Sequence, residues 1–181
     1  MDAEIILENE DWDQSAIDII HSAAEAVFSE LKLAHEDVEI CFLCTNNEEV
    51  QILNKTYRGI DKPTNVLSFP AEAYEDDDDD DLDCDRGDDC GCSCSECKGC
   101  DCGFDSNPPC LLGSAAFAFE TIRDEAVDQK KTFDDHLKHL VVHSVLHLLG
   151  YDHEDDEEAK KMEELEVRIL KSIGVANPYS E

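Results

Sequence analysis

The histidines at positions 143, 147 and 153 are spaced so that they can bind one metal ion. His143 and His147 are four residues apart, and on a helix two side chains at that spacing lie on one face, a turn apart. Gly150 can adopt the left-handed conformation that ends a helix. The chain that turns back after Gly150 could bring His153 to the same ion. The sequence therefore predicts a metal site with three imidazole ligands.

Three protein ligands are typical of a catalytic zinc site rather than a structural one, because the fourth position can hold a water molecule. Zinc lowers the pKa of that water towards about 7 and so produces a nucleophile. The alternative is that these are ordinary surface or core histidines. Three histidines at this spacing, beside a residue suited to end a helix, favour the catalytic site.

The residue after the first of these histidines indicates which bond is broken. The spacing matches the zinc-peptidase pattern H-E-x-x-H-x-x-G-x-x-H, except that Ser144 stands where those peptidases have their general base. A serine hydroxyl cannot replace that glutamate at neutral pH. A phosphodiester needs less from a base, since the metal and cationic side chains stabilise charge on the phosphoryl oxygens. Phosphodiester hydrolysis is therefore favoured, and a metallopeptidase with Asp152 or Glu154 as its base is the alternative enzyme.

One pattern runs through residues 139–143 and 146–153, through 53–54, 57–58, 61 and 63–70, and through Met162, Glu166, Ile169, Leu170 and Gly174 of a closing helix. In these residues the chain resembles the YbeY endoribonucleases, also called ribosomal RNA maturation factors. The resemblance covers nearly the whole chain except residues 72–110, and at Asn65 and Ser114 this chain lacks acidic residues that the family commonly has. No role for a carboxylate is therefore carried over to those two positions.

The resemblance implies a zinc-dependent endoribonuclease that is specific for single strands. It would act in maturation of the 3′ end of small-subunit ribosomal RNA and in ribosome quality control. His143, His147 and His153 would hold the zinc and take part in catalysis. Arg58 would also take part in catalysis, because its guanidinium suits the paired oxygens of a phosphodiester. The expected partners are single-stranded RNA or ribosomal RNA, and a ribosomal subunit or basic ribosome-associated proteins. A non-enzymatic protein of ribosome assembly or metal binding is the remaining alternative.

The charge of the chain opposes binding to RNA. Forty-six acidic and fourteen basic residues give a net charge of −32, which is the wrong sign for gripping a phosphate backbone. Lys55, Arg58 and Lys62 form the densest positive charge near the residues that carry the resemblance, and we expect them to contact substrate, although the two lysines could simply be solvated. His139, one turn before His143, could orient the site, contact substrate or merely pack. The sequence does not decide between a small basic patch and a basic docking partner.

Residues 72–110 interrupt the pattern with an acidic, cysteine-rich insert. Six consecutive aspartates are followed by eight cysteines, and fifteen acidic against two basic residues give this stretch a net charge of −13. So little apolar surface cannot form a core, and we expect a disordered loop between two strands. Its repeated C-x-C and C-x-x-C spacings look like a metallothionein fragment and suit additional zinc or cuprous ions. Unliganded low complexity is the alternative.

The remaining chain predicts an α+β domain. We expect a mixed four-stranded sheet packed with helices around a central metal-binding helix, in one domain over residues 1–181 that the insert interrupts. The acidic start and the lack of an 18-residue apolar run predict a cytoplasmic protein with no membrane segment. The expected strands are 4–7, 38–44, 66–70 and 111–119, and the expected helices are 14–33, one from Asn46 or Asn47 to near Gly59, 120–129, one from Thr132 or Asp134 to Leu149, and 157–173.

Overall fold

The computed structural model describes residues 2–33, 38–71, 110–151 and 156–179. The chain divides into two compact units, one formed by Met1–Ala71 with Pro109–Glu181 and the other by Glu72–Pro108. All described residues belong to the first unit, so the insert predicted at 72–110 lies outside them except for Cys110, which is the first residue of a strand and not part of a loop. The described part contains four strands and five helices, which confirms the predicted α+β class.

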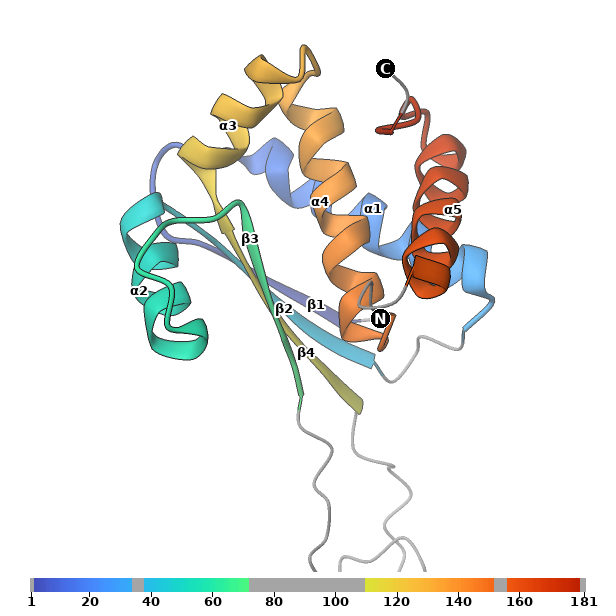
Figure 1. Ribbon diagram of the computed structural model, residues 1–181, viewed down its shortest axis with the longest axis horizontal. Coiled ribbons are helices and arrows are strands. Elements are labelled where there is room, and N and C mark those ends of the chain that lie inside the picture. The colour runs from blue at the N-terminus through green and yellow to red at the C-terminus, as the bar shows by residue number, and fades with distance from the viewer. Residues whose placement is uncertain (1, 34–37, 72–109, 152–155, 180–181) are drawn as a thin grey trace, which may run out of the picture. The chain divides into compact units, whose positions relative to one another are not determined.

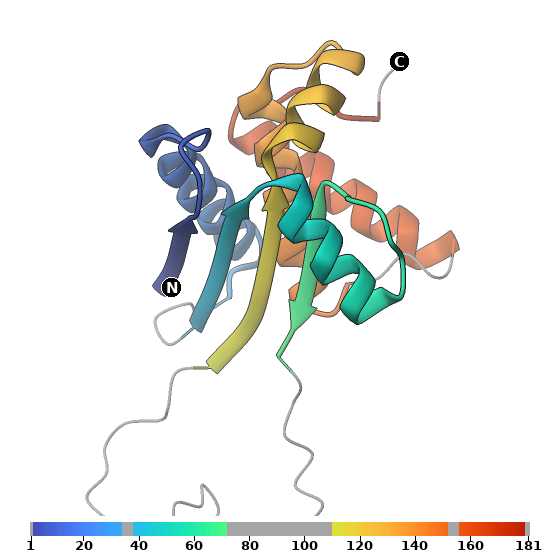
Figure 2. The ribbon, with the colours of Figure 1, turned by 90° about the vertical axis from the view of Figure 1, so that its left-hand side faces the viewer.

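The four strands form one mixed sheet in the order β1-β2-β4-β3 (Figure 2). The neighbours β1, β2 and β4 are parallel, and β3 runs antiparallel to β4. Because β3 is an edge strand, the proline at its end does not disturb the pairing of a central strand. The strands are β1 (Asp2–Leu7), β2 (Val38–Thr45), β3 (Val66–Pro70) and β4 (Cys110–Ala118).

Side-chain caps define where two of the helices begin. The Asn46 side chain accepts a hydrogen bond from the Glu49 N–H at 3.0 Å, and the Thr132 hydroxyl accepts one from the Asp135 N–H at 3.1 Å. Each satisfies a backbone donor that the first helical turn leaves without a partner. The sequence offered two candidate caps for each of these helices, and the structure shows that Asn46 and Thr132 are the residues that cap them. The helices are α1 (Gln14–Leu31), α2 (Asn47–Arg58), α3 (Phe119–Asp128), α4 (Phe133–Leu148) and α5 (Asp156–Ser172).

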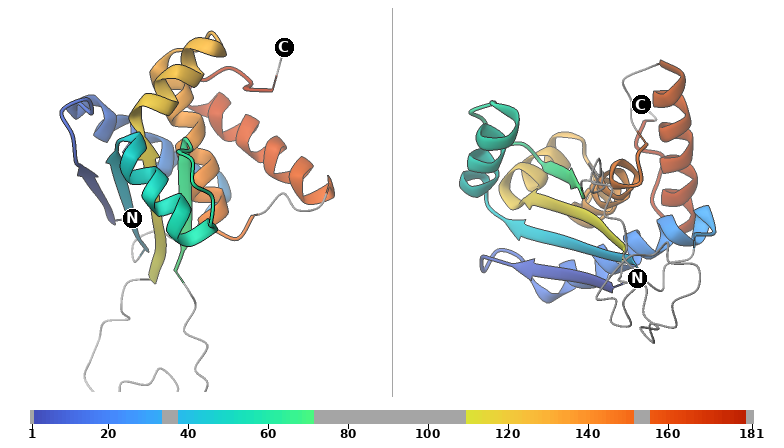
Figure 3. Two further views of the ribbon diagram at one scale, coloured as in Figure 1. Left: turned by 60° about the vertical axis from the view of Figure 1, so that its left-hand side comes forward. Right: turned by 90° about the horizontal axis from the view of Figure 1, so that it is seen from below.

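Helices cover the sheet on both faces (Figures 1 and 3). Helices α1, α4 and α5 lie over one face, and α2 lies over the other. Because successive strand residues point to opposite faces, β4 contributes to both sides. Phe117 belongs to the large core on the α4 side, whereas Ala116 and Ala118 belong to a small cluster with Val50 of α2 and Leu67 of β3.

Helix α4 is the centre of the larger core, as predicted. It packs against α1, α3, α5, β3 and β4, and buried side chains occupy most of its circumference, from Leu137 to Leu148. A helix packed on so many sides holds its side chains in fixed positions. None of the described helices is long and apolar enough to cross a membrane.

A glycine in β4 allows the end of α4 to approach the sheet. Gly113 has a φ of +139°, and it follows a bulge at which β4 has one residue more than β2. A Cβ atom there would lie 2.3 Å from the Phe69 carbonyl oxygen and 2.9 Å from a methyl carbon of Leu148. Only glycine fits both the backbone conformation and this space. The contact fixes the C-terminal end of α4, where the predicted metal ligands lie.

Candidate metal centre

Four histidines follow one another along α4. The ring centroids are 6.3 Å apart from His136 to His139, 6.4 Å from His139 to His143, and 4.5 Å from His143 to His147. Their spacing of three or four residues keeps them on one side of the helix. The four histidines therefore form one stripe along α4, and its last two rings are the closest pair.

The geometry of His143 and His147 fits two ligands of one metal ion. Their Nε2 atoms lie 3.1 Å apart. In a tetrahedral zinc site with Zn–N bonds of about 2.0–2.1 Å, two ligand nitrogens are separated by about 3.3 Å. The two rings therefore already converge on a point that an ion could occupy.

The helix ends after these ligands as the sequence predicts. Gly150 has a φ of +86°, its N–H donates to the His147 carbonyl at 3.0 Å, and the Tyr151 N–H donates to the Leu146 carbonyl at 3.0 Å. These two bonds form a Schellman motif, which turns the chain back at the end of a helix. His153 lies outside the described residues, and within them no group of three or more metal-ligating side chains is found. The third ligand stays a prediction.

A buried glutamate from α5 orients His143. The ring donates from Nδ1 to Glu166 Oε1 at 2.7 Å, and only 1% of the Glu166 residue is exposed. The hydroxyl of Tyr179 donates to the second oxygen, Oε2. With its proton held on Nδ1, His143 presents the lone pair of Nε2 towards His147. Metal-binding histidines are commonly held in this way by a carboxylate on the other ring nitrogen.

The surroundings of Glu166 keep it ionised. Burial alone would raise its pKa, but its contacts with His139, His143 and Tyr179 outweigh burial and lower the pKa to about 2. Burial and the adjacent carboxylate raise the pKa of Tyr179, so its hydroxyl stays protonated and can donate. Glu166 is thus a fixed negative acceptor at neutral pH, which favours a cation at the neighbouring imidazoles.

His139 lies beside this carboxylate. Its Nε2 atom is 3.8 Å from Glu166 Oε2, and its ring meets the Tyr179 ring edge to face at 5.9 Å. Its side chain is 16% exposed. Apart from the neighbouring histidines of α4, the described contacts of His139 are therefore with residues that hold His143, which favours an orienting role over contact with substrate.

Ser144, which replaces the peptidase glutamate, does not face the histidine pair. It is fully buried, and its hydroxyl donates to the Val141 carbonyl at 2.9 Å. The side chain is used within the helix and cannot activate water. The alternative peptidase bases, Asp152 and Glu154, lie outside the described residues.

The structure places the predicted phosphate-binding cations away from α4, with Lys55 and Arg58 on α2 and Lys62 in the segment that follows α2. Arg58 ends α2, which lies over the face of the sheet opposite to α4, with β3 between them (Figures 2 and 3). Lys55 forms an ion pair with Asp61 at 2.7 Å. Arg58 and Lys62 are exposed and, among the described residues, form no ion pair. The expected three-cation cluster is thus reduced to two available cations, and no described contact joins it to the histidines.

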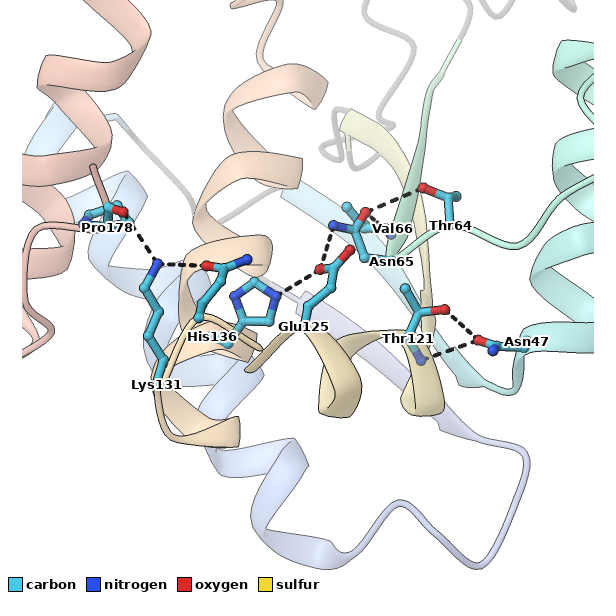
Figure 4. A network of polar contacts seen from close by, with 10 residues as sticks. Asn47, Thr64, Asn65, Val66, Thr121, Glu125, Lys131, His136 and Pro178 are labelled. Carbon is cyan, nitrogen blue, oxygen red and sulfur yellow. Dashed lines mark hydrogen bonds and ion pairs between the residues drawn. The ribbon is translucent and has the colours of Figure 1, made fainter. Parts of the chain in front are cut away.

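A second histidine–glutamate pair lies at the other end of α4 (Figure 4). His136 Nε2 is 2.9 Å from Glu125 Oε2, and the Asn65 amide donates to the same oxygen at 3.0 Å. The network joins α3, α4 and the residue before β3. His136 is 2% exposed, and burial, partly offset by Glu125, lowers its pKa. His136 is therefore neutral at pH 7.

The family resemblance included Glu166 only as a residue of the closing helix, and Tyr179 was not predicted as part of the site. One signal could have identified Glu166: it shares a helical face with the apolar Met162, Leu165 and Ile169, which are all buried. A glutamate on an apolar face needs a partner, because an unpaired buried charge is costly. Tyr179 lies 13 residues further along the chain, and no sequence pattern links it to the site.

The chain is similar to known proteins in sequence and in fold. The chain matches the family described as Endoribonuclease YbeY over residues 4–174. A Bradyrhizobium sp. (strain BTAi1) protein named Endoribonuclease YbeY is 41% identical, covering 98% of this chain and 92% of that protein. A Parvibaculum lavamentivorans protein of the same name is 39% identical, covering 99% and 85%. The solution structure of TM1509 from Thermotoga maritima shares the fold, with a TM-score of 0.55 and 22% identity over 94% of this chain and 88% of that one.

Proposed function

The chain belongs to the YbeY endoribonuclease family, and we propose that it is a zinc-dependent endoribonuclease that cuts single-stranded RNA. Its substrate would be ribosomal RNA, at the 3′ end of the small-subunit species, and it would act in ribosome quality control in the cytoplasm. The names of its relatives support the class of reaction. The local geometry of α4 supports the metal.

His143, His147 and His153 would hold the zinc ion. Zinc, when bound there, would lower the pKa of a water molecule and so supply the nucleophile that attacks phosphorus. Glu166 keeps the proton of His143 on Nδ1, so that Nε2 is available as a ligand. The Tyr179 hydroxyl holds the second Glu166 oxygen, which limits rotation of the carboxylate.

Arg58 would bind a phosphate of the RNA and neutralise its charge. An RNA strand that reaches both Arg58 and the histidines has to pass the edge strand β3, because α2 and α4 lie on either side of it (Figure 2). A single strand can bend round such an edge, whereas a stiff duplex cannot. This favours a single-stranded substrate. Removal of one charge-stabilising donor typically lowers kcat about 100-fold or more, and Arg58→Ala should do so while zinc remains bound.

The observation that carries the proposal is the 3.1 Å distance between Nε2 of His143 and Nε2 of His147, with Nδ1 of His143 bonded to Glu166. The test is His147→Ala, with His21→Ala on α1 as a matched control. We expect His147→Ala to lose the tightly bound zinc and cleavage of a single-stranded RNA together, and His21→Ala to keep both. Cleavage by metal-free His147→Ala protein would contradict the proposal.

The insert would form a separate metal-binding loop that the catalytic site does not need. Pro70 pairs with Gly113, and the Ala71 N–H donates to the Leu112 carbonyl at 3.0 Å. Deleting residues 75–109 therefore leaves five residues, 72–74 with 110 and 111, between Ala71 and Leu112, which are already adjacent, and this is an ordinary hairpin loop. The deletion variant should fold, bind about one zinc ion and cleave RNA. If the deletion variant bound no zinc, the metal site would be formed by the cysteines of the insert and not by the histidines.

A further inference from the structure

We propose that the side chain of Tyr57 is a stacking surface for one base of a single-stranded RNA, beside phosphates bound by Arg58 and Lys62. This base-binding subsite rests on the function proposed above and adds to it a contact with the RNA that is independent of phosphate charge. The four residues that form it are Tyr57 and Arg58 at the end of α2, Lys62 in the segment that follows, and Phe69 on β3.

Tyr57 is unusually exposed for an aromatic residue on a helix packed against a sheet. It is 67% exposed. It is nevertheless held in place, because its ring meets the Phe69 ring edge to face, with 5.0 Å between the centroids and 64° between the planes. Phe69 in turn packs on the cluster formed by Val50, Leu67, Ala116 and Ala118. An exposed ring on a rigid support is the feature that single-stranded nucleic acid binders use for base stacking.

The charge around Tyr57 has the sign that RNA requires. Residues 50–71 contain three cations against one anion, a net charge of +2 in a chain of net −32. Asp61 is paired with Lys55 at 2.7 Å, which leaves Arg58 and Lys62 for an anionic ligand. Electrostatic complementarity therefore directs a polyanion to this part of the described surface.

Two cations cannot hold RNA tightly by charge alone. For single strands, the slope of log affinity against log salt is about −0.7 per neutralised phosphate, so two contacts give only about −1.4. The rest of so acidic a protein repels the backbone. Affinity must therefore come largely from contacts that salt does not screen. Stacking of one base on an aromatic ring typically changes affinity by about 5- to 100-fold, and Tyr57 can supply it.

The other exposed apolar side chain of α2 does not extend this surface. Ile52 is 56% exposed, but it precedes Tyr57 by five residues and is rotated from it by about 140° on the helix. The two side chains do not form one continuous apolar patch of the kind that docks a protein. Ile52→Ala is therefore a matched control for the loss of an exposed apolar group from the same helix.

The experiment measures the dissociation constant of the intact protein for a fluorescently labelled single-stranded RNA dodecamer, whose integrity is checked by gel electrophoresis after each titration. We expect Tyr57→Ala to weaken binding about 5- to 100-fold, and Tyr57→Phe and Ile52→Ala to change it less than twofold. Tyr57→Leu keeps an apolar contact with Phe69 but lacks a flat ring, so it should bind as poorly as Tyr57→Ala while melting near the parent temperature.

A set of dodecamers, each with one abasic position, completes the test. At one position the abasic RNA should bind the parent protein as weakly as intact RNA binds Tyr57→Ala, and the two losses should not add. Equal binding by Tyr57→Ala and parent, or retained binding by Tyr57→Leu, would overturn the stacking role while leaving the nuclease intact. Altered binding of a protein partner with unchanged RNA affinity would assign the ring to a protein contact instead. Failure of the parent protein to bind or cleave RNA would overturn the function itself.

Discussion

Helix α4 carries two histidine–glutamate pairs that differ in which ring nitrogen takes the carboxylate. His143 donates from Nδ1 to Glu166, and its Nε2 atom faces His147. His136 instead directs Nε2 to Glu125, and its Nδ1 atom is buried without a hydrogen-bond partner among the described residues. Nε2 is the ring nitrogen farther from the backbone. Because Glu125 takes Nε2 and Nδ1 is buried, His136 has no ring nitrogen directed at an ion that a second ligand could share.

The two pairs also differ in exposure. The side chain of His136 is 3% exposed and that of His143 is 26% exposed. Glu125 is further held by the amide of Asn65, so the His136–Glu125 pair connects three segments of the fold. The comparison shows that a histidine–carboxylate pair is not by itself a metal site. The metal site that we propose is the pair in which the carboxylate takes Nδ1 and a second imidazole faces Nε2.

The strongest test of this comparison removes one imidazole from each pair. His143→Ala should weaken zinc binding by about 100- to 1,000-fold, since structural zinc sites yield roughly 10–16 kcal/mol from four ligands, or about 3–4 kcal/mol per ligand. His136→Ala should leave zinc affinity within about threefold. Competition with a chromophoric chelator measures both. Similar losses in the two variants would mean that both pairs serve the metal.

The next test removes charge from the glutamates and keeps their shape. Glu166→Gln should lower zinc affinity about 10- to 100-fold, the usual cost of losing a carboxylate behind a histidine ligand. Tyr179→Phe should act in the same direction but less, because it removes only the donor to Oε2. Glu125→Gln is the matched control and should leave zinc affinity unchanged. A Glu166→Gln protein with parental affinity would reduce Glu166 to a packing role.

The local parts of the site follow from the sequence because they depend on neighbouring residues. The spacing of His143 and His147, the left-handed Gly150 and the cap at Thr132 are all properties of one helix and its ends. Helix boundaries shifted by one or two residues, as at α1, which ends at Leu31 rather than Leu33 because Lys32 turns left-handed.

The partners of these histidines could not be predicted, because tertiary packing chooses them. Glu166 reaches His143 across 23 residues of sequence, and Asn65 reaches Glu125 across 60. No periodicity or spacing encodes such contacts. The separation of Arg58 from the histidines is also a tertiary result, since it depends on α2 packing against the face of β3 and β4 that α4 does not cover. The sequence gives the residue types, and the fold decides which of them meet.

A smaller effect is expected at the His136–Glu125 pair. Asn65→Asp replaces the amide donor to Glu125 with a carboxylate, so two like charges would face each other across about 3.0 Å. We expect a loss of about 1–3 kcal/mol in the free energy of unfolding at pH 7, measured by urea denaturation. The loss should shrink at lower pH, as one carboxyl takes up a proton. Asn46→Asp is the control, because both residues cap a helix equally well.

The smallest expected effect is the pH dependence that His136 contributes. Burial, the largest influence, lowers the pKa of His136 below its ordinary value of 6.5, and Glu125 offsets this only in part. Below about pH 6.5 the unfolded chain therefore binds a proton that the folded chain does not, so stability falls with decreasing pH until the folded pKa is reached. One proton changes the slope by at most about 1.4 kcal/mol per pH unit.

The measurement is urea denaturation between pH 7.5 and 5 with metal removed by a chelator, for the parent protein and His136→Gln. Glutamine can donate to Glu125 but does not titrate in this range. The parent should lose more stability than the variant as the pH falls, because only the parent has a histidine that must stay neutral when folded. The opposite sign would mean that the Glu125 carboxylate outweighs burial and that His136 is charged in the folded protein. The pair would then be an ion pair rather than a neutral imidazole bonded to a carboxylate.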